Sequence, residues 1–266
     1  MRDSFNLAGS TFSYGITGTF SDYTAEYTKC DNPTGLIGDP YVGKKYGEIW
    51  GYKVDGLFRN DKEAAEYASR IDLSTVASGY YTATGAYGKG VRGGDIKYLD
   101  LNGDNIVNGG KGTLDDPGDR RVIGNSSPRY QYGASLNFSW YGFDVSVFMQ
   151  GIGRLDWYPG ADNLRFWGPY CRPYATFVPK NFMSQVWSEE NPDAYFPRAR
   201  AYTSLNSNSG TAYYTNDRYL QNLAYCRLKN LTIGYTIPRR LTSKVGIKEC
   251  RIYFSGENLA TWSALK

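Results

Sequence analysis

Three oxygen-bearing side chains stand at alternate positions in the segment DLNGDNIVN, where their spacing suits the binding of a cation. Asp100, Asn102 and Asp104 are followed by Ile106, whose backbone carbonyl could add an oxygen, and by Asn108. This spacing is typical of the first half of an EF-hand-like loop, in which Ca²⁺ gathers several oxygens at about 2.3 to 2.6 Å. The segment therefore predicts a calcium site.

The second half of this loop departs from the calcium pattern. Lys111 occupies the position where a bidentate acid belongs, and Asn105 occupies a position that is normally glycine. After an insertion, Asp115, Asp116 or Asp119 could supply the missing acid. The alternative is a polar loop of Asx turns that holds no metal.

A second group of candidate binding residues is aromatic. Its members lie in one long connection among prolines and glycines: Trp157, Tyr158, Phe166, Trp167 and Tyr170. On an outer loop, flat rings could stack on sugar faces or on a partner protein, because aromatic rings bury a large area at little entropic cost. The alternative is that these rings pack among themselves and hold the loop together.

Catalytic chemistry is poorly supported. Histidine is absent, which excludes Ser-His-Asp and Cys-His catalysis and histidine-ligated zinc. Adjacent acids such as Glu189 and Glu190 do not indicate a glycosidase, because neighbouring residues on a strand point apart. The four cysteines show no CxxC spacing, and Cys226 and Cys250 either pair or remain reduced thiols. We expect no enzyme.

The elements that must position the candidate residues are β-strands. From Tyr130 to Trp140 apolar and polar residues alternate, and after a turn at Tyr141-Gly142 the alternation resumes from Phe143 to Gln150, with Phe148 breaking the pattern. Two strands of about ten residues joined by a tight turn are typical of a transmembrane β-barrel. A half-buried hairpin in a soluble sheet has the same period and is the alternative.

The same reasoning predicts further elements along the chain. Strands are expected at Thr11 to Ser21, Glu48 to Phe58, Leu223 to Ile237 and Glu249 to Asn258, and a short helix at Asn60 to Arg70. The long connection from Gly151 to Asp217 disfavours a compact soluble domain but suits the outer loops of a barrel. Roughly six or seven strands would leave edges unpaired, so we expect part of a larger barrel.

Composition agrees with this interpretation. Aromatic residues make up 16% of the chain, and the net charge of +4 is spread over both signs without a basic run, so nucleic acid is not an expected partner. No apolar run reaches the roughly 18 residues of a membrane-spanning helix, so any crossing must use strands. Met1 is not followed by a recognisable secretory signal, which predicts a cytosolic protein or an excerpt. Outward-facing aromatic residues are expected at lipid or its interface: Phe12, Tyr14, Tyr130, Trp140 and Tyr235.

Several segments together resemble the SusC/RagA family of TonB-dependent outer-membrane transporters. The matching segments include GEIWGYKVDGLFRNDKEAAEY, GDIKYLDLNGD, DRRVIGNSSPRYQYGASLNFSWYGFDVSVFMQG, WSEENPDAYFPR, RLKNLTIGYTIPRRL and RIYFSGENLATWSALK, which begin at Gly47, Gly94, Asp119, Trp187, Arg227 and Arg251. Their order and spacing agree with the family from about Gly47 onward.

The resemblance implies an all-β fold, an antiparallel up-and-down transmembrane β-barrel of roughly 22 strands with a plugged lumen and long extracellular loops. Residues 1–266 are expected to form its carboxy-terminal part, without the signal peptide, plug domain and closing strand. The family imports glycans or peptides through the outer membrane of Gram-negative bacteria, with energy from TonB and a SusD-like surface lipoprotein as lid. No cofactor is expected beyond Ca²⁺, for which the resemblance favours Asp119 as the missing acid. The rival hypothesis is a secreted, soluble, calcium-binding β module that recognises carbohydrate.

Overall fold

The computed structural model describes residues 1–82, 90–171, 178–200 and 212–265. The chain divides into two compact units. The first, here called the sheet unit, comprises Met1–Thr24, Ser127–Asp156 and Asn222–Lys266. The second, the loop unit, comprises Ala25–Ser126 and Trp157–Gln221. Parts of the loops expected from the sequence, at 83–89, 172–177 and 201–211, lie outside the described residues.

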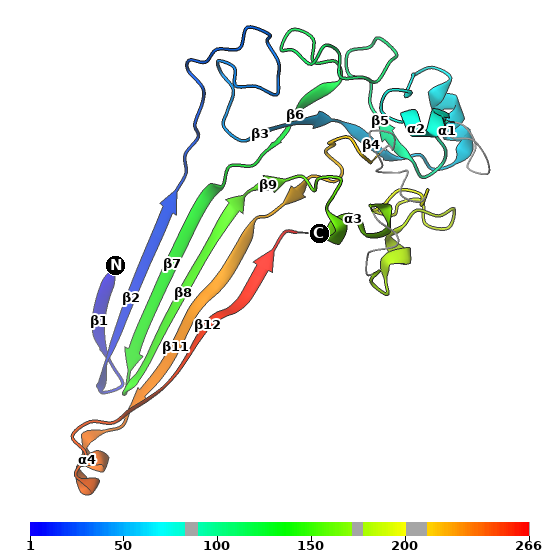
Figure 1. Ribbon diagram of the computed structural model, residues 1–266. Helices are drawn as coiled ribbons and strands as arrows, with labels where there is room; N and C mark the ends of the chain where they lie inside the picture. Colours follow the sequence, from blue (N-terminus) through cyan, green and yellow to red (C-terminus); the bar gives the residue numbers. More distant parts are fainter. Residues whose placement is uncertain (83–89, 172–177, 201–211, 266) are drawn as a thin grey trace. The chain divides into compact units, whose positions relative to one another are not determined.

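The sheet unit is built on one six-stranded antiparallel sheet (Figure 1). In order across the sheet its strands are β1 (Arg2–Leu7), β2 (Ser10–Ser21), β7 (Arg129–Trp140), β8 (Phe143–Arg154), β11 (Tyr225–Thr236) and β12 (Arg251–Ser263). Strands that follow one another along the sheet unit are neighbours in the sheet, so the sheet is an up-and-down meander. Strands β1 and β12 form its two edges.

Connections at the two ends of the sheet differ in length. Ala8 and Gly9 join β1 to β2, and Tyr141 and Gly142 join β7 to β8, all four with positive φ. Positive φ at both central residues is the type I′ turn that matches the twist of a tight hairpin. At the opposite end, β2 continues to β7 and β8 to β11 through the segments of the loop unit. Two tight turns at one end and two long connections at the other agree with the sequence-based expectation, whereas β11 and β12 are joined at the tight-turn end by residues 237–250.

Strand register separates the sheet into an apolar and a polar face. One row of paired residues across five strands is Tyr14, Phe138, Val145, Ile233 and Phe254. The adjacent row, on the other face, is Gly15, Asn137, Ser146, Thr232 and Ser255. Because successive side chains of a strand point to opposite faces, one face is covered by hydrocarbon and rings and the other by hydroxyl and amide groups. The predicted alternation is confirmed.

The loop unit holds the hydrophobic core. Within the described residues, every buried hydrophobic side chain belongs to this unit. Its elements are β3 (Glu48–Tyr52), β4 (Val54–Leu57), α1 (Asp61–Ala68), α2 (Ser78–Thr82), β5 (Ile96–Tyr98), β6 (Arg120–Asn125), α3 (Leu164–Trp167), η1 (Gly168–Tyr170) and η2 (Phe182–Gln185). Two short strands, β9 (Asp156–Trp157) and β10 (Gln221–Asn222), pair with each other where the chain passes from one unit to the other.

The helix expected between Asn60 and Arg70 is present as α1. Asn60 caps its first turn, since its side-chain oxygen accepts a hydrogen bond from the Glu63 amide at 2.9 Å. The Glu63 carboxylate in turn accepts one from the Arg59 amide at 2.7 Å. These reciprocal bonds satisfy amide groups that the first turn of a helix leaves without partners.

Several details differ from the sequence-based predictions. The single strand expected at Glu48 to Phe58 is two, because β3 pairs with β6 whereas β4 pairs with β5, and both belong to the loop unit. Strand β1 was not predicted, since its run of mixed polarity has no clean alternation. Strand β12 extends to Ser263 rather than Asn258.

Of the two alternatives for Cys226 and Cys250, a disulfide or reduced thiols, the structure shows reduced thiols. Cys226 lies at the start of β11 and pairs with Trp262 near the end of β12, while Cys250 precedes the start of β12. Antiparallel pairing therefore puts the two thiols at opposite ends of the hairpin, about 35 Å apart at roughly 3.3 Å per residue. Among the described helices, none has the length and hydrophobicity needed to traverse a bilayer.

Candidate functional site

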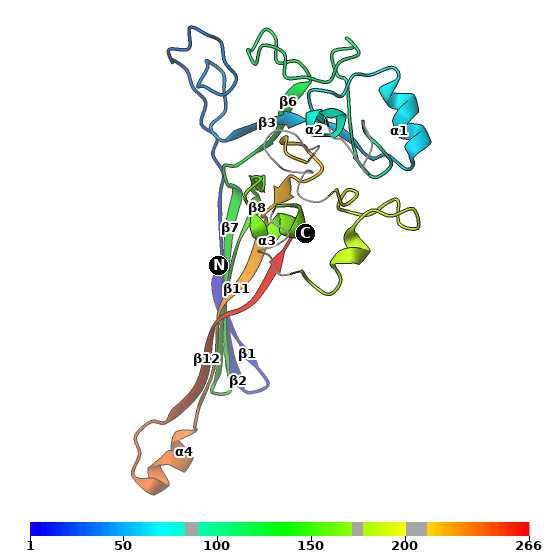
Figure 2. The ribbon, with the colours of Figure 1, turned by 45° about the vertical axis from the view of Figure 1, so that its right-hand side comes forward.

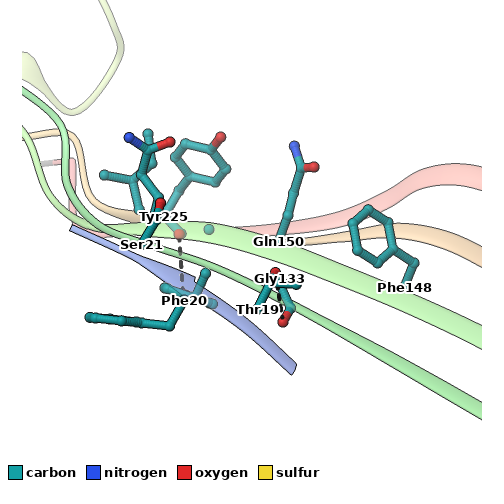
Figure 3. Close-up of a pocket in the computed structure, with 11 residues that line it drawn as sticks. Thr19, Phe20, Ser21, Gly133, Phe148, Gln150 and Tyr225 are labelled. Carbon is teal, nitrogen blue, oxygen red and sulfur yellow. Dashed lines mark hydrogen bonds between the residues drawn. The ribbon is translucent and has the colours of Figure 1, made fainter. Parts of the chain in front are cut away.

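A hollow of about 340 Å³ lies on the polar face of the sheet unit, at the end from which the long connections leave (Figure 3). Gly133 sits between Thr19 and Gln150 in one row across the sheet. In Figure 3 the Phe148 and Gln150 side chains rise from β8 on one side, whereas the Phe20 ring points away. The hollow is lined by Thr19, Phe20, Ser21, Gln131, Tyr132, Gly133, Phe148, Gln150, Gly151, Ile152 and Tyr225.

The floor of the hollow depends on a glycine. A Cβ added at Gly133 would meet Thr19 Oγ1 at 2.9 Å and the Phe148 ring at 3.5 Å. The Thr19 hydroxyl lies 3.4 Å from the Gly133 carbonyl oxygen, to which it donates a hydrogen bond. Gly133 therefore leaves open the space between a hydroxyl group and an aromatic ring.

Phe148 explains why the hollow is not purely polar. Register pairs it with Ser135 on one side and Asn230 on the other, so it stands on the polar face. The register of β11 shifts between Leu228 and Asn230, next to this ring. A β-bulge of this kind re-aims side chains locally. The break in alternation at Phe148 is thus a structural feature of the hollow.

The chemistry of the hollow is uncharged. Its lining offers amide groups from Gln131 and Gln150, hydroxyl groups from Thr19 and Ser21, and an aromatic face from Phe148. None of the lining residues is an acid, a lysine or an arginine. The hollow can therefore donate and accept hydrogen bonds and pack on an apolar surface, but it lacks a carboxylate pair for acid-base work.

The five aromatic residues predicted to bind a ligand all lie in the loop unit, and most are part of its core. The rings of Trp167 and Tyr170 are buried, with 0% and 3% of their surface exposed. Phe166 and Tyr158 are half-buried and pack against the same core. Trp157 is half-buried in β9. Burial of Trp167 and Tyr170 favours the packing alternative for these two rings, whereas ligand binding by the group stays a prediction.

Hydrogen bonds tie the phenols of this group to the core. The Tyr170 hydroxyl donates to the Pro197 carbonyl at 2.6 Å, and the Tyr158 hydroxyl donates to the Tyr214 carbonyl at 3.1 Å. Burial raises the pKa of both phenols above its usual value, because the charged form would be poorly solvated. Both therefore remain neutral donors.

The predicted calcium loop is ordered by its own side-chain oxygens. The Asp100 carboxylate accepts hydrogen bonds from the Gly103 and Asn105 amides at 2.7 and 2.9 Å. Asp104 accepts one from the Ile106 amide at 2.8 Å. Asn105 has a φ of 64°, the left-handed conformation that glycine normally supplies at this position and that asparagine tolerates.

Asp119, the predicted closing acid, organises this loop from the interior. Its side chain is fully buried and accepts hydrogen bonds from the amides of Leu101, Asn102 and Asn108. Two of these contacts, at 2.7 and 2.8 Å, have the length of strong charge-assisted hydrogen bonds. Asp119 is thus brought to the loop across the insertion, in contact with its backbone.

Few oxygen-bearing side chains of the loop remain as possible ligands for a cation. Asn102 and Asp104 are exposed and Asp100 is half-buried. The Asn102 amide donates to Asp104 at 2.9 Å. Within the described residues no group of three His, Cys, Asp or Glu side chains is placed to hold a metal. A cation here would depend on two carboxylates supplemented by amide and backbone oxygens.

The hollow was missed from sequence, although one signal pointed to it. Phe148 interrupts a run of residues that otherwise alternate, and an aromatic residue on a polar strand face requires a reason. The residues around Phe148 could not be predicted from sequence, because Thr19 and Gln131 come from strands that are more than a hundred residues apart in the chain.

No family model matches the chain. In sequence it is similar to three proteins of Formosa agariphila: TonB-dependent receptor P26 is 29% identical over 64% of this chain, P3 is 25% identical over 83%, and P39 is 27% identical over 90%. The chain spans only 15%, 18% and 24% of the length of these relatives.

Solved structures share the fold. The RagAB peptide importer in its closed-closed state aligns with a TM-score of 0.54 at 15% identity, over 98% of this chain and 25% of that chain. Its open-open state aligns with a TM-score of 0.51 at 15% identity, over 98% of this chain and 24% of that chain. In sequence the chain is thus similar to proteins named TonB-dependent receptors, and it shares its fold with the RagAB importer structures.

Proposed function

We propose that the chain forms part of the wall and mouth of an outer-membrane barrel that imports glycans or peptides with energy delivered through TonB. The observation that carries this proposal is the two-faced sheet. Its apolar side chains are exposed or half-buried, and every described buried hydrophobic side chain lies in the other unit. An apolar face of this extent is costly in water but matches the hydrocarbon of a bilayer.

Aromatic residues at both ends of the apolar face support a membrane position. At the short-turn end Trp140 packs on Tyr141 with ring centroids 5.0 Å apart. At the other end Phe20 stacks on Tyr130 at 6.4 Å. From Tyr132 to Trp140 the apolar positions of β7 span about 26 Å along the strand at roughly 3.3 Å per residue. Barrels carry an apolar band about 25 Å tall between aromatic girdles, although strand tilt shortens the vertical span.

The size of the barrel and its partners follow from this assignment as proposals. The edges β1 and β12 require neighbouring strands in lipid, because unpaired backbone groups are not tolerated there, and a barrel of roughly 22 strands would supply them. The relatives are named as TonB-dependent receptors. We expect TonB as the energy donor and a SusD-like surface lipoprotein as the lid over the mouth. The names of the relatives are those of receptors and importers, which agrees with the absence of a predicted enzymatic role.

Between the two substrate classes, the hollow favours glycans. Amide and hydroxyl groups beside an aromatic face suit an uncharged ring with many hydroxyls and one apolar side. Its volume of about 340 Å³ is at the small end of ligand sites, which range over about 300–1,000 Å³, and is enough for one sugar unit. A peptide would gain from charged groups that the lining does not provide.

The test uses the natural gene product that carries this chain, purified in detergent. We expect it to fractionate with outer membrane and to bind neutral oligosaccharides in preference to peptides of matched mass. Phe148→Ala and Gln150→Ala should each weaken oligosaccharide binding about 5- to 30-fold, the equivalent of roughly 1–2 kcal/mol for a lost ring contact or hydrogen bond. Tyr253→Ala, on the polar face near the short-turn end, is the aromatic control and should leave affinity unchanged.

Two results would count against this proposal. A protein that stays monomeric in water without detergent would contradict membrane insertion and favour the soluble carbohydrate-binding module. Preferential binding of peptides, unaffected by the Phe148 variant, would remove the hollow from the substrate path. Calorimetry of both ligand sets, in parallel with the Tyr253 control, distinguishes these cases.

We also propose that Asp100, Asn102 and Asp104, with the Ile106 carbonyl and Asn108, bind Ca²⁺ on the loop that Asp119 holds in place. With two flexible carboxylates we expect a dissociation constant of about 0.1–1 mM, as in extracellular calcium modules. Terbium luminescence sensitised by nearby aromatic residues, with calcium as competitor, measures this binding. Asp104→Asn should abolish it, whereas equal signals from both proteins would show that the loop holds no metal.

A further inference from the structure

The connection between β11 and β12, residues 237–250, is a folded element rather than a plain turn. It contains α4 (Arg239–Thr242) and η3 (Ser243–Val245) and lies beyond the ends of both strands (Figure 1 and Figure 2). Thr242 is buried, and its carbonyl accepts a hydrogen bond from the Ile247 amide at 3.1 Å. The Ile237 amide donates to the Cys250 carbonyl at 2.9 Å and closes the base. We call this element the α4 turn.

The α4 turn concentrates positive charge. Within residues 237–250 its cations are Arg239, Arg240, Lys244 and Lys248, opposed by a single acid, Glu249. All four cations are exposed. Across the described part of the chain, none of them enters an ion pair. This excess of three positive charges is large beside the net charge of +4 for the whole chain.

The same turn also exposes hydrocarbon. Leu241, Val245 and Ile247 show 50%, 70% and 46% of their surface to solvent. A water-facing turn of a soluble protein would gain by burying or replacing these side chains. Apolar side chains interspersed with arginine and lysine are instead typical of elements that lie in a membrane interface, where the chains enter the acyl boundary and the cations remain at the phosphates.

The position of the turn agrees with this interpretation. Strand β11 ends just after Tyr235, whose ring contacts that of Phe143 with centroids 4.5 Å apart. Trp140 and Tyr141 lie at the same end of the sheet. Aromatic belts of this kind lie at the level of the lipid headgroups, so the residues that follow them emerge at the headgroup surface. The short-turn end of a barrel faces the periplasm.

We infer that the α4 turn binds anionic phospholipid of the periplasmic leaflet. In this site Arg239, Arg240, Lys244 and Lys248 contact headgroup phosphates while Leu241, Val245 and Ile247 enter the acyl boundary. The inference rests on the proposed membrane position of the sheet. It adds a lipid partner and an anchor that fixes the depth of the β11–β12 hairpin.

The test compares lipid binding by the natural gene product in an uncharged detergent. Phosphatidylglycerol and phosphatidylcholine are titrated separately, and native mass spectrometry counts the bound lipids. Replacement of the four cations of the turn by Gln should reduce the preference for phosphatidylglycerol at least about tenfold, since each cation near an anionic surface contributes roughly a factor of five. Salt should reduce the wild-type preference, because the cations are exposed.

The matched control carries the same change of charge elsewhere. Lys29, Lys62, Lys111 and Lys180 are exposed lysines of the loop unit, and none enters an ion pair with another described residue. Their replacement by Gln should leave the lipid preference as in the wild type. Leu241→Ser with Val245→Ser should weaken retention of both lipids. Glycerol phosphate should not compete, because it lacks acyl chains.

The outcomes separate this inference from the proposed function. Equal preference for phosphatidylglycerol in the wild type and the four-cation variant would overturn the lipid site while leaving membrane insertion intact. Effective competition by glycerol phosphate would show a free-phosphate site instead of a lipid site. Failure of the protein to enter membranes of any composition would instead contradict the proposed function itself.

Discussion

Replacing Trp167 by alanine tests whether the aromatic cluster of the loop unit is a core or a binding surface. Its ring is fully buried and lies 4.8 Å from the Phe166 ring and 5.0 Å from the Tyr219 ring, between centroids. Its indole N–H donates to the carbonyls of Pro159 and Gly160 at 3.3 and 3.1 Å. The side chain therefore contributes both packing and a satisfied polar group.

The expected cost follows from these contacts. Truncation of a buried tryptophan to alanine costs about 3–5 kcal/mol, because a cavity remains where the ring was. We expect about 4 kcal/mol for Trp167→Ala. Trp167→Phe keeps a ring but loses the indole hydrogen bond and part of the volume, for about 2 kcal/mol. Trp157→Ala, at a half-buried site, should cost less than about 1 kcal/mol.

Hydrogen exchange measured by mass spectrometry resolves the effect to the loop unit. At about 1.4 kcal/mol per factor of ten, a loss of 4 kcal/mol accelerates exchange of protected amides in residues 157–171 roughly a thousandfold. Amides of the β7–β8 hairpin should be unaffected, which serves as an internal control. Unchanged protection in Trp167→Ala, combined with a loss of substrate affinity, would refute the packing argument and restore a ligand-binding role for this ring.

Three further changes test other parts of the structure. Asp119→Ala removes the buried acceptor of hydrogen bonds from three backbone amides, and each such charge-assisted bond contributes about 1.5–3 kcal/mol. Denaturant titration should therefore show that the loop unit loses at least about 3 kcal/mol of stability. A loss below about 1 kcal/mol would contradict the structural role of Asp119. Burial raises the pKa of Asp95 from 3.8 to about 7, so the folded state binds more protons and thermal stability should fall as pH rises from about 4 to 7. The dependence of melting temperature on pH over this range should disappear in Asp95→Asn. An equal dependence in the variant and the wild type would show that Asp95 is not the group responsible. A Cβ at Gly234 would lie 2.5 Å from Arg251 Nη2 and 2.6 Å from Asp144 Oδ1, so Gly234→Ala should open this ion pair. Melting temperatures should then show that Asp144→Asn lowers stability in the wild type but not in the Gly234 variant.

Sequence alone determined five of the six strands of the sheet unit, with β1 as the exception. Alternation from Tyr130 to Gln150 sets which side chains share a face, because a strand has a period of two whatever it pairs with. The Tyr141-Gly142 turn is equally local, since it depends on a few neighbouring residues. For these features the pattern was sufficient.

Only the tertiary structure decided which segments meet. The strand expected at Glu48 to Phe58 divides because its partners, β5 and β6, lie far along the chain. Asp119 reaches the loop at Asp100 through an insertion whose course no spacing rule describes, and Trp167 is buried because distant segments cover it. The hollow beside Gly133 likewise needs strands β2, β7 and β8 in register. Contacts between distant segments depend on the tertiary fold of the whole chain. Local periodicity contains no information about which distant segments come into contact.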